Sequence, residues 1–375
     1  MPQISIDDLE SNRYLQDILS QPDALRLALA KTDLSALDKV AQALAAGKID
    51  RIILTGMGAS YYGLYPAWLQ LAAAGLPAVW VDAAELVHHV PALVTGRSLL
   101  WVASQSGQSA EILALLDQIE ARPPAALLAM TNEVSSPLAK SALEPGRSML
   151  GALAPLYAKP EETPSTRTYL HTIAIGQLVA LCLAGEQLAP HLAALQATAD
   201  GIADYLKDWK AHMERIRQAV AGAENSYVLI GRGLSLASAY SGALNLQEAA
   251  KIAAIGLQAA EFRHGPLEMA GAGLTVFVFA GEKETIDQQK IFGLNHRLWK
   301  ELRALKTNAW LLEPSSGSAY LQRMEEGTIP IPHTTGIGLP LAEIIPIQLM
   351  CVLLSKLRGF EPGKFRHIGK VTTIE

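Results

Sequence analysis

The chain has 375 residues, a length that favours two domains of ordinary size over a single one. Half of the residues are hydrophobic and 18% are charged, which is typical of a globular protein and not of a disordered one. The net charge of −5 argues against a nucleic-acid partner, because such proteins usually carry a basic surface. A local site for a small anion stays compatible with this composition.

The N-terminus, the longest apolar stretch and the cysteines bear on where the protein works. Residues 1–14 are polar and acidic, so we expect no signal peptide. The apolar residues 339–354 include Glu343 and predict a buried helix, not a membrane span. Cys182 and Cys351 have apolar neighbours, which favours buried free thiols over a disulfide or a nucleophile. We therefore expect a cytoplasmic protein that does not contact a membrane.

Short apolar runs alternate along the chain with runs whose apolar residues recur at helical spacing. Seven of the short runs are predicted as strands: Arg51–Thr55, Ala78–Val81, Leu99–Ala103, Ala126–Met130, Tyr227–Ile230, Leu274–Phe279 and Ala309–Leu312. Continuously apolar strands separated by helices indicate parallel sheets that are covered on both faces. The sequence thus predicts an α/β fold of mostly parallel, doubly wound sheets, each an α-β-α sandwich.

An internal repeat sets the number of domains. Arg51–Ser60 aligns with Ser226–Ser235, and the same offset places Leu99–Ala103 on Leu274–Val278. Self-similarity at a fixed offset is the mark of a duplicated unit. We therefore expect a helical lead-in at residues 1–34, a first domain at residues 35–205, a second copy at residues 206–350 and a C-terminal tail at residues 351–375.

A glycine turn, Gly56-Met57-Gly58, follows the first predicted strand and opens a helix. Such a turn lets the backbone approach a ligand, and the helix start attracts an anion. A dinucleotide-binding turn, with Asp82 on the ribose, is the alternative, but it needs a small residue where Tyr61 stands. The Gly-Lys-Ser/Thr triplet of phosphate-loop NTPases is absent from the sequence. We predict no nucleotide cofactor.

The serine loop, Ser104-Gln105-Ser106-Gly107-Gln108-Ser109, stands between a predicted strand and a predicted helix. Its three hydroxyls and free backbone N–H groups suit the acceptor oxygens of a phosphate monoester. One serine is enough to cap a helix, so three favour anion binding. The second copy has Phe279-Ala280-Gly281-Glu282 at the equivalent place. We therefore expect only the first copy to hold a phosphate in this way.

Other common chemistries lack their sequence patterns. The nine histidines form no His-Glu-x-x-His motif, and the adjacent His88 and His89 would point in different directions. There is no Cys-x-x-Cys pair and no Gly-x-Ser-x-Gly turn. We predict neither a metal site nor a Ser-His-Asp hydrolase.

Several motifs in order resemble the sugar isomerase (SIS) family. They are GMGASYYG at residues 56–63, SQSGQSAE at 104–111, Ser165-Thr166, GALNLQE at 242–248, EFRHGPL at 261–267 and HIGKVTTIE at 367–375. They cover nearly the whole chain and are similar to the isomerase half of glucosamine-6-phosphate synthase and to double-SIS sugar-phosphate deaminases and isomerases. The resemblance implies two SIS domains with flavodoxin- or Rossmann-like sheets.

The resemblance also implies how a sugar phosphate is bound. The positions that match the family's phosphate site are Ser60, Ser104, Gln105, Ser106 and Ser109. Those that would contact the sugar are Ser165, Thr166 and Asn245. The ring-opening histidine of the family is delivered by a neighbouring subunit, which implies a homodimer with a shared site.

Three further residues match the family's catalytic groups. Glu248 would move a proton between C1 and C2, His264 would open the ring, and Lys370 would meet the open-chain carbonyl. One carboxylate can remove and return a proton next to a carbonyl, histidine exchanges protons near neutral pH, and lysine can polarise a carbonyl or form a Schiff base. Each residue alone has a plain structural reading as a solvated or tail residue, so the functional assignment rests on their order and spacing together.

The chain also departs from the synthase. Neither cysteine lies near the N-terminus, where a glutaminase domain would need its nucleophile, so we expect no glutamine dependence. Asn245 stands where the synthase has a lysine, so the amination chemistry is expected to differ. The loop before Ser165 is shorter and contains Pro164, which puts the choice of sugar in question.

These observations predict an enzyme that acts on a phosphorylated amino sugar without a cofactor. The favoured reaction converts glucosamine 6-phosphate to fructose 6-phosphate and ammonia by ring opening and a C2-to-C1 proton shift. An isomerase or deglycase for another hexose phosphate is the enzymatic alternative. The alternative from another class is a non-catalytic sugar-phosphate-binding regulator, which usually carries a DNA-binding segment longer than the N-terminal lead-in.

Overall fold

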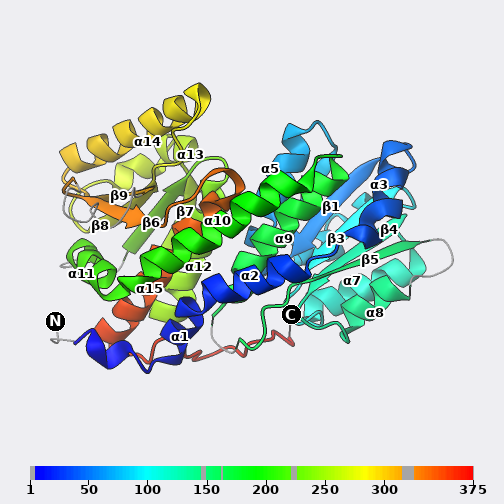
Figure 1. Ribbon diagram of the computed structural model, residues 1–375, viewed down its shortest axis with the longest axis horizontal. Helices are drawn as coiled ribbons and strands as arrows, with labels where there is room; N and C mark the ends of the chain where they lie inside the picture. Colours follow the sequence, from blue (N-terminus) through cyan, green and yellow to red (C-terminus); the bar gives the residue numbers. More distant parts are fainter. Residues whose placement is uncertain (1–4, 145–148, 162–163, 221–225, 315–324, 375) are drawn as a thin grey trace. The chain divides into compact units, whose positions relative to one another are not determined.

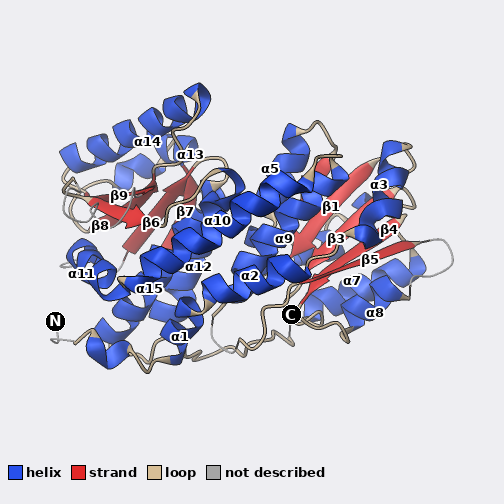
Figure 2. Ribbon diagram, viewed as in Figure 1, coloured by secondary structure: helices blue, strands red, loops and turns tan. Residues whose placement is uncertain are grey.

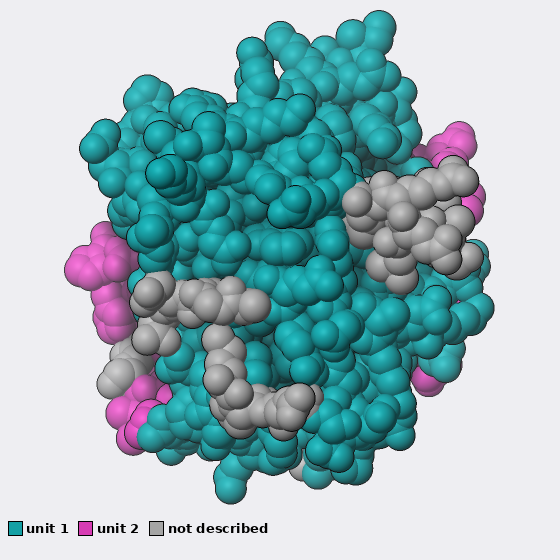
Figure 3. Space-filling model, turned by 90° about the vertical axis from the view of Figure 1, so that its left-hand side faces the viewer, with its two compact units in different colours: residues 1–23, 163–166, 194–366 teal, residues 24–162, 167–193, 367–375 magenta. Residues whose placement is uncertain are grey.

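The computed structural model describes residues 5–144, 149–161, 164–220, 226–314 and 325–374. The chain divides into two compact units, which are coloured separately in Figure 3. Unit 1 comprises residues 1–23, 163–166 and 194–366, and unit 2 comprises residues 24–162, 167–193 and 367–375. The C-terminal tail from His367 onward is therefore part of the same unit as the serine loop.

Unit 2 is built on a sheet of five parallel strands in the order β2-β1-β3-β4-β5 (Figure 1). The strands are β1 (Arg51–Gly56), β2 (Ala78–Trp80), β3 (Ser98–Ala103), β4 (Ala126–Thr131) and β5 (Leu150–Pro155). The helices around them are α3 (Asp38–Ala45), α4 (Gly58–Gly63), α5 (Tyr65–Ala73), α6 (Ala83–His88), α7 (Ala110–Ala121), α8 (Pro137–Leu143) and α9 (Arg167–Leu183).

Successive residues of the central strands of unit 2 enter two separate cores. Leu99 and Trp101 pack with α3, α5 and α9 on one face of the sheet. Leu100 and Val102 pack with α6, α7 and α8 on the other face. Because every residue of β3 and β4 is buried, these strands read as continuous apolar runs, as expected for a sheet covered on both sides. The result is the predicted α-β-α sandwich (Figure 2).

Unit 1 repeats the architecture, with five parallel strands in the order β10-β9-β8-β6-β7. Its strands are β6 (Ser226–Gly231), β7 (Ala253–Gln258), β8 (Leu274–Phe279), β9 (Asn308–Pro314) and β10 (Thr328–Ile331). Its helices are α1 (Arg13–Leu19), α11 (Trp209–Val220), α12 (Ser235–Ala250), α13 (Ala259–Arg263), α14 (Ile286–Ala304) and α15 (Leu339–Leu357). Two more helices, α2 (Gln21–Lys31) and α10 (Leu188–Lys207), have residues in both units.

The two sheets have the same topology when the first is read from β2 and the second from β7. Strand β6 lies between β7 and β8, as β1 lies between β2 and β3. This order is the flavodoxin-like variant of the doubly wound fold. The predicted fold class, two duplicated, doubly wound α/β domains, is therefore confirmed.

All seven predicted strands exist, and the sequence missed three: β5, β7 and β10. Each missed strand lies at the edge of its sheet. Strands β5 and β7 are only partly buried and contain Gly151 and Gly256, and β10 contains Pro330. Partial burial and glycine weaken the apolar signal of β5 and β7, whereas β10 is fully buried but only four residues long, and its proline argues against a strand.

Helix α15 was predicted as a buried core helix, and the structure confirms this. The segment Gly336–Leu357 is long and apolar enough to cross a membrane, yet 94% of its most apolar window is buried within the protein. Cys351 on this helix is a free, buried thiol, and Cys182 is a free, half-buried one.

Candidate functional site

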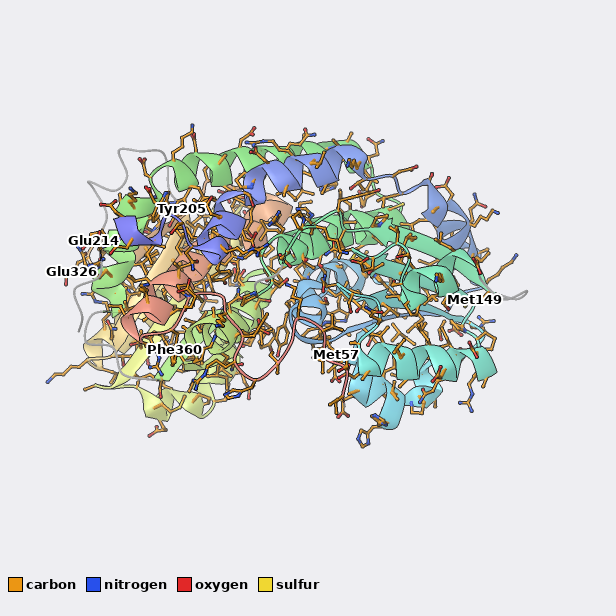
Figure 4. The ribbon with its side chains drawn as sticks, turned by 90° about the horizontal axis from the view of Figure 1, so that it is seen from below. Met57, Met149, Tyr205, Glu214, Glu326 and Phe360 are labelled. Atoms are coloured by element: carbon orange, nitrogen blue, oxygen red, sulfur yellow. The ribbon has the colours of Figure 1, made fainter. Side chains whose placement is uncertain are left out.

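The site begins where the strand order of unit 2 reverses, between β1 and β3. The last residues of these strands, Gly56 and Ala103, are paired in register. A Cβ on Gly56 would lie 2.6 Å from the carbonyl oxygen of Ala103, so only glycine allows this approach. The glycine turn at Met57 (Figure 4) and the serine loop therefore start side by side, at the crevice where such sheets bind ligands.

The serine loop is ordered by its own hydroxyls. Ser104 and Ser106 are nearly buried, and their Oγ atoms accept hydrogen bonds from the N–H groups of Gly107 (3.1 Å) and Gln108 (3.3 Å). Gly107 has a φ of +62°, and a Cβ there would lie 2.2 Å from the Ser136 hydroxyl. A hydroxyl that accepts a bond still has a hydrogen to donate, so both serines keep a donor that could bind an anion.

Helix α7 begins directly after this loop. Ser109 is its N-cap, but the Ser109 hydroxyl makes no capping hydrogen bond. The N–H of Ala110 donates to the carbonyl oxygen of Thr372 at 3.2 Å. The sequence predicted free backbone N–H groups here, and that detail was wrong for Gly107, Gln108 and Ala110, because serine side chains and the C-terminal tail accept from them.

Ser60 lies half-buried on α4, beyond the glycine turn. The next residue, Tyr61, stacks on Trp80 with ring centroids 4.0 Å apart. Asp82, considered above as a ribose ligand, is the N-cap of α6 and accepts from the Glu85 N–H at 3.0 Å. Asp82, which favoured a dinucleotide site, and Tyr61, which argued against one, thus both have structural partners.

Lys370, a predicted site residue, lies on the C-terminal tail, which belongs to unit 2. Its Nζ lies 3.0 Å from Oε2 of Glu161, whose side chain is fully buried, while 24% of the Lys370 side chain is exposed. Glu161 also accepts from the backbone N–H of Thr168 (3.1 Å) and from its hydroxyl (2.7 Å). A buried carboxylate needs such partners, because an unpaired charge in the interior is costly.

Glu248 and Asn245 lie one turn apart on α12 of unit 1, where Asn245 is buried and Glu248 half-buried. The helix ends at Lys251, which has a left-handed backbone (φ 56°). Its Nζ donates to the carbonyl oxygens of Glu248 (2.6 Å) and Ala249 (3.1 Å). This cation completes the helix end, as basic side chains near a C-terminus commonly do, and holds the last turn that carries Glu248.

His264 lies just after α13, also in unit 1, and is exposed. Its backbone N–H donates to the Glu261 carbonyl oxygen at 2.9 Å. Ser165 is half-buried and Thr166 is fully buried, and both belong to unit 1. The structure thus groups Ser60, the serine loop and Lys370 within unit 2, and Asn245 and Glu248 within unit 1.

Several buried groups have shifted pKa values. Burial lowers the pKa of His171 on α9 to about 4, although the Leu156 carbonyl oxygen lies 2.6 Å from its Nδ1. In unit 1, burial raises the pKa of Glu343 to about 8 and that of Glu282 to about 7. Among the described residues, no group of three or more His, Cys, Asp or Glu is arranged to hold a metal ion.

Comparison with known proteins identifies the family. The SIS domain model matches residues 47–181 and 223–292, more than half of the chain and parts of both units. The chain belongs to the SIS domain family. The two matched segments include the serine loop, Glu248 and His264, as the sequence motifs suggested.

Individual relatives are more distant. The chain is 26% identical over 365 residues to a glutamine–fructose-6-phosphate aminotransferase (isomerizing) of Pyrococcus horikoshii. That match includes 96% of this chain but 57% of the relative, so the chain spans little more than half the length of such proteins.

Two solved structures share the fold. The C-terminal domain of glucosamine-fructose-6-phosphate aminotransferase from Francisella tularensis matches with a TM-score of 0.77 and 21% identity, covering 96% of this chain and all of that one. Glucosamine-6-phosphate deaminase from Thermotoga maritima matches with a TM-score of 0.70 and 19% identity, covering 96% and 99%.

The sequence analysis did not single out two polar residues that organise the site. Glu161 stands in the shortened loop before Ser165, and Asn132 matches none of the motifs described above. The available signal for Glu161 was a carboxylate shortly before the hydroxyl-rich start of a helix, an arrangement that satisfies helix N–H groups. Asn132 follows the end of a buried strand, where polar residues of α/β sheets gather.

Proposed function

We propose that the chain is an amino-sugar-phosphate deaminase/isomerase that converts glucosamine 6-phosphate to fructose 6-phosphate and ammonia. The observation that carries this proposal is the docking of the lysine-bearing tail at the serine loop, where Ala110 donates to Thr372 and Lys370 pairs with Glu161. A phosphate-binding loop and an ammonium group on one framework suit a substrate with a phosphate at one end and a carbonyl at the other. Family membership supports the same substrate class.

In this proposal the phosphate is the anchor. The hydroxyls of Ser60, Ser104, Ser106 and Ser109 and the Gln105 amide donate to its oxygens. Hydrogen bonds to a charged acceptor are roughly twice as strong as neutral ones, so an all-neutral site can bind a dianion tightly. Ser165, Thr166 and Asn245 contact the sugar hydroxyls and, in this substrate, its amine.

The chemistry then proceeds in three steps. His264 from a second subunit transfers a proton from the anomeric hydroxyl to the ring oxygen, which opens the ring. Glu248 removes the proton from C2 and returns it to C1. A second proton passes from the amine nitrogen to the C1 oxygen, which leaves a C1 hydroxyl and an imine at C2. Water adds to that imine and ammonia leaves, giving the ketose. The Lys370 ammonium stabilises negative charge that develops on the carbonyl oxygen during the shift.

A homodimer follows from the assigned role of His264. This histidine is exposed, as are Ile255 (49%) and Met269 (50%) in the same unit. Exposed large apolar side chains on the unit that carries this histidine suit a surface that another subunit covers.

The second candidate is pure isomerisation of another hexose phosphate. Asn245 is the observation that favours it, because a buried amide offers no charge to handle an amine or ammonia. A sugar-phosphate-binding regulator is the candidate from a different class. It would use the serine loop but would not need Glu248 or Lys370.

One assay separates these candidates. The purified protein is incubated with glucosamine 6-phosphate, and ammonia and fructose 6-phosphate are measured together. The reverse reaction is run with fructose 6-phosphate and either ammonia or glutamine, and other hexose phosphates are offered in parallel. Formation of ketose and ammonia in equal amounts supports the deaminase. Turnover restricted to amine-free sugars supports the isomerase. Tight binding by calorimetry without any turnover would replace both with the regulator.

A further inference from the structure

Glu161 is a buried acidic group that contacts the tail. Its carboxylate accepts hydrogen bonds from the backbone N–H of Thr168, from the Thr168 hydroxyl and from the Lys370 ammonium. Since the side chain has no exposed surface, its orientation is fixed by these partners and not by solvent. Lys370, by contrast, keeps part of its surface open to a ligand.

The Thr168 hydroxyl connects this carboxylate to the loop that follows β4. It accepts from Nδ2 of Asn132 at 2.9 Å while it donates to Glu161. The orientation of the Asn132 amide is also fixed by a second hydrogen bond, because its Oδ1 accepts from the Ala158 N–H at 2.9 Å. These hydrogen bonds thus define the orientation of the Asn132 amide and of the Thr168 hydroxyl.

Asn132 also contacts the serine loop. Its backbone N–H donates to the carbonyl oxygen of Gln105 at 3.2 Å, and the Thr131 hydroxyl donates to the same oxygen at 3.2 Å. A continuous path of hydrogen bonds therefore runs from Gln105 through Asn132, Thr168 and Glu161 to Lys370. All of these residues belong to unit 2.

We propose that Glu161 is a positioning residue that fixes the Lys370 ammonium relative to the serine loop through the Asn132–Thr168 link. The inference rests on the proposed function for its catalytic meaning, but the positioning itself is a property of the free protein. The role of Glu161 is to hold and orient Lys370, not to contact the substrate.

Two features argue that the link does more than stabilise the fold. The tail is anchored a second time, two residues beyond Lys370, by the Ala110 N–H on the Thr372 carbonyl oxygen. Two further hydrogen bonds to Glu161 come from Thr168, in the first turn of α9. Backbone and hydroxyl donors such as these can satisfy a neutral glutamine oxygen as well, whereas the ammonium alone requires the charge.

The first test measures the tail directly. The free proteins are treated with acetic anhydride, and acetylation of Lys370 is followed by mass spectrometry relative to the exposed Lys39. In Glu161→Gln the Lys370 rate is expected to rise by about tenfold, because a charge-assisted hydrogen bond is lost. The matched carboxylate control is Glu120→Gln, an exposed position on α7, which should leave the Lys370 rate unchanged.

The second test isolates the link through Thr168. Thr168→Val removes the hydroxyl that joins Asn132 to Glu161. Thr172→Val removes a buried hydroxyl one turn later on α9, which donates to the Thr168 carbonyl oxygen. Acetylation of Lys370 should rise in Thr168→Val and not in Thr172→Val. This pair also keeps the proposal testable if Glu161→Gln does not fold, which thermal melts would show.

The third test uses turnover of glucosamine 6-phosphate. Glu161→Gln should lower kcat by about 100-fold, the effect of misplacing a catalytic group by about an ångström. KM should stay within about twofold, because the hydroxyls that capture the phosphate are untouched. A residue with only a structural role would change both parameters or neither.

The outcomes separate the two proposals. Faster Lys370 acetylation in Glu161→Gln and Thr168→Val, with no turnover by the wild type, would sink the proposed function and leave the positioning role standing. Active wild type together with unchanged Lys370 acetylation and unchanged kcat in both variants would overturn the positioning role. Equal effects of Thr168→Val and Thr172→Val would also overturn it.

Discussion

The two sheets share one topology but end differently at the edge where ligands bind in such folds. In the first copy, β3 leads into three serines and a glycine with φ of +62°. In the second copy, β8 leads into Ala280, Gly281 and Glu282. There the Arg232 Nε donates to Asn295 Oδ1 at 2.9 Å, and Asn295 Nδ2 donates to the Ala280 carbonyl oxygen at 3.0 Å.

This difference shows how a duplicated fold divides its work. The second copy satisfies the polar groups at its switch point with its own side chains, and the Glu282 carboxylate also accepts from the Gly336 N–H. The first copy instead presents small hydroxyls, which can bind a ligand without a large desolvation cost. The second copy carries its candidate reactive groups elsewhere, at the end of α12 and after α13.

The sharpest test of this division removes the candidate proton carrier of the second copy. Glu248→Gln keeps the size of the side chain but cannot accept the C2 proton. We expect kcat to fall by about 1,000-fold, within the range that general acid–base groups contribute, while binding of the sugar phosphate measured by calorimetry is unchanged. The control is Glu214→Gln on α11 (Figure 4), an exposed position of the same unit.

A kcat that survives Glu248→Gln would remove the proton-transfer assignment from the second copy. A loss of both binding and turnover would instead indicate that Glu248 helps to form the sugar site.

The next prediction concerns His264 and the second subunit. Glu248→Gln and His264→Ala are each expected to be inactive, but mixed dimers would contain one site with both native residues if His264 acts across the interface. Mixing the two variants after mild dissociation should then restore about one quarter of wild-type activity, since half of the dimers are mixed and each has one intact site. Mixing a variant with itself is the control. No recovery in verified mixed dimers would place both residues in the same subunit's site.

A smaller effect is expected from one aligned pair of serines. Ser60 and Ser235 occupy equivalent places in the two repeats, yet Ser235 donates to the buried Glu343 at 2.7 Å, whereas Ser60 is assigned to the phosphate. Ser60→Ala should raise KM by about tenfold through loss of a hydrogen bond to a charged group. Ser235→Ala should leave KM unchanged and lower the melting temperature. The comparison fails if the two substitutions have the same effect on KM.

The same comparison explains which parts of the fold and of the site could be predicted from the sequence. Central strands and the serine loop were predictable, because continuous burial and helix-start chemistry leave a local pattern. The edge strands β5, β7 and β10 were not, because β5 and β7 are only partly buried and the four-residue β10 contains a proline.

The hydrogen bonds that support the site were harder still to predict from the sequence. Glu161 is seven residues from Thr168 but 209 from Lys370, so no local pattern connects the carboxylate to the ammonium it holds. The same holds for the contact of Thr372 with Ala110. The assignments of Glu248, His264 and Lys370 came from motif order alone and stay predictions until the variants above are measured.

The smallest predicted effect lies in the pH dependence of stability, which should also distinguish the copies. Both copies contain a buried histidine whose pKa burial lowers to about 4: His171 in the first, and His212, stacked on Tyr205 (Figure 4), in the second. The unfolded chain binds these protons near pH 6.5, so both copies should lose stability as the pH falls from there toward 4. This loss of stability at acid pH is expected in both copies.

A loss of stability as the pH rises should occur in the second copy alone. The pKa of Glu343 is about 8 in the folded protein because burial disfavours the carboxylate, and one of its oxygens has no hydrogen-bond partner among the described residues. The folded state therefore keeps a proton that the unfolded chain releases near pH 4.5. The free energy of unfolding should fall as the pH rises through this window, by at most about 1.4 kcal/mol per unit for this group.

Glu343→Gln removes that proton exchange and keeps an oxygen to accept from Ser235. Hydrogen exchange at pH 6 and pH 8 should show that β6 and β8 lose more protection in the wild type than in this variant, after correction for the intrinsic rate. The strands β1 and β3 should respond equally in both proteins, because Glu343 belongs to unit 1. Glu282, whose pKa of about 7 has the same sign, would leave a residual slope in the variant. Identical pH profiles for wild type and variant in β6 and β8 would show that the buried acid does not set the alkaline limit of the second copy.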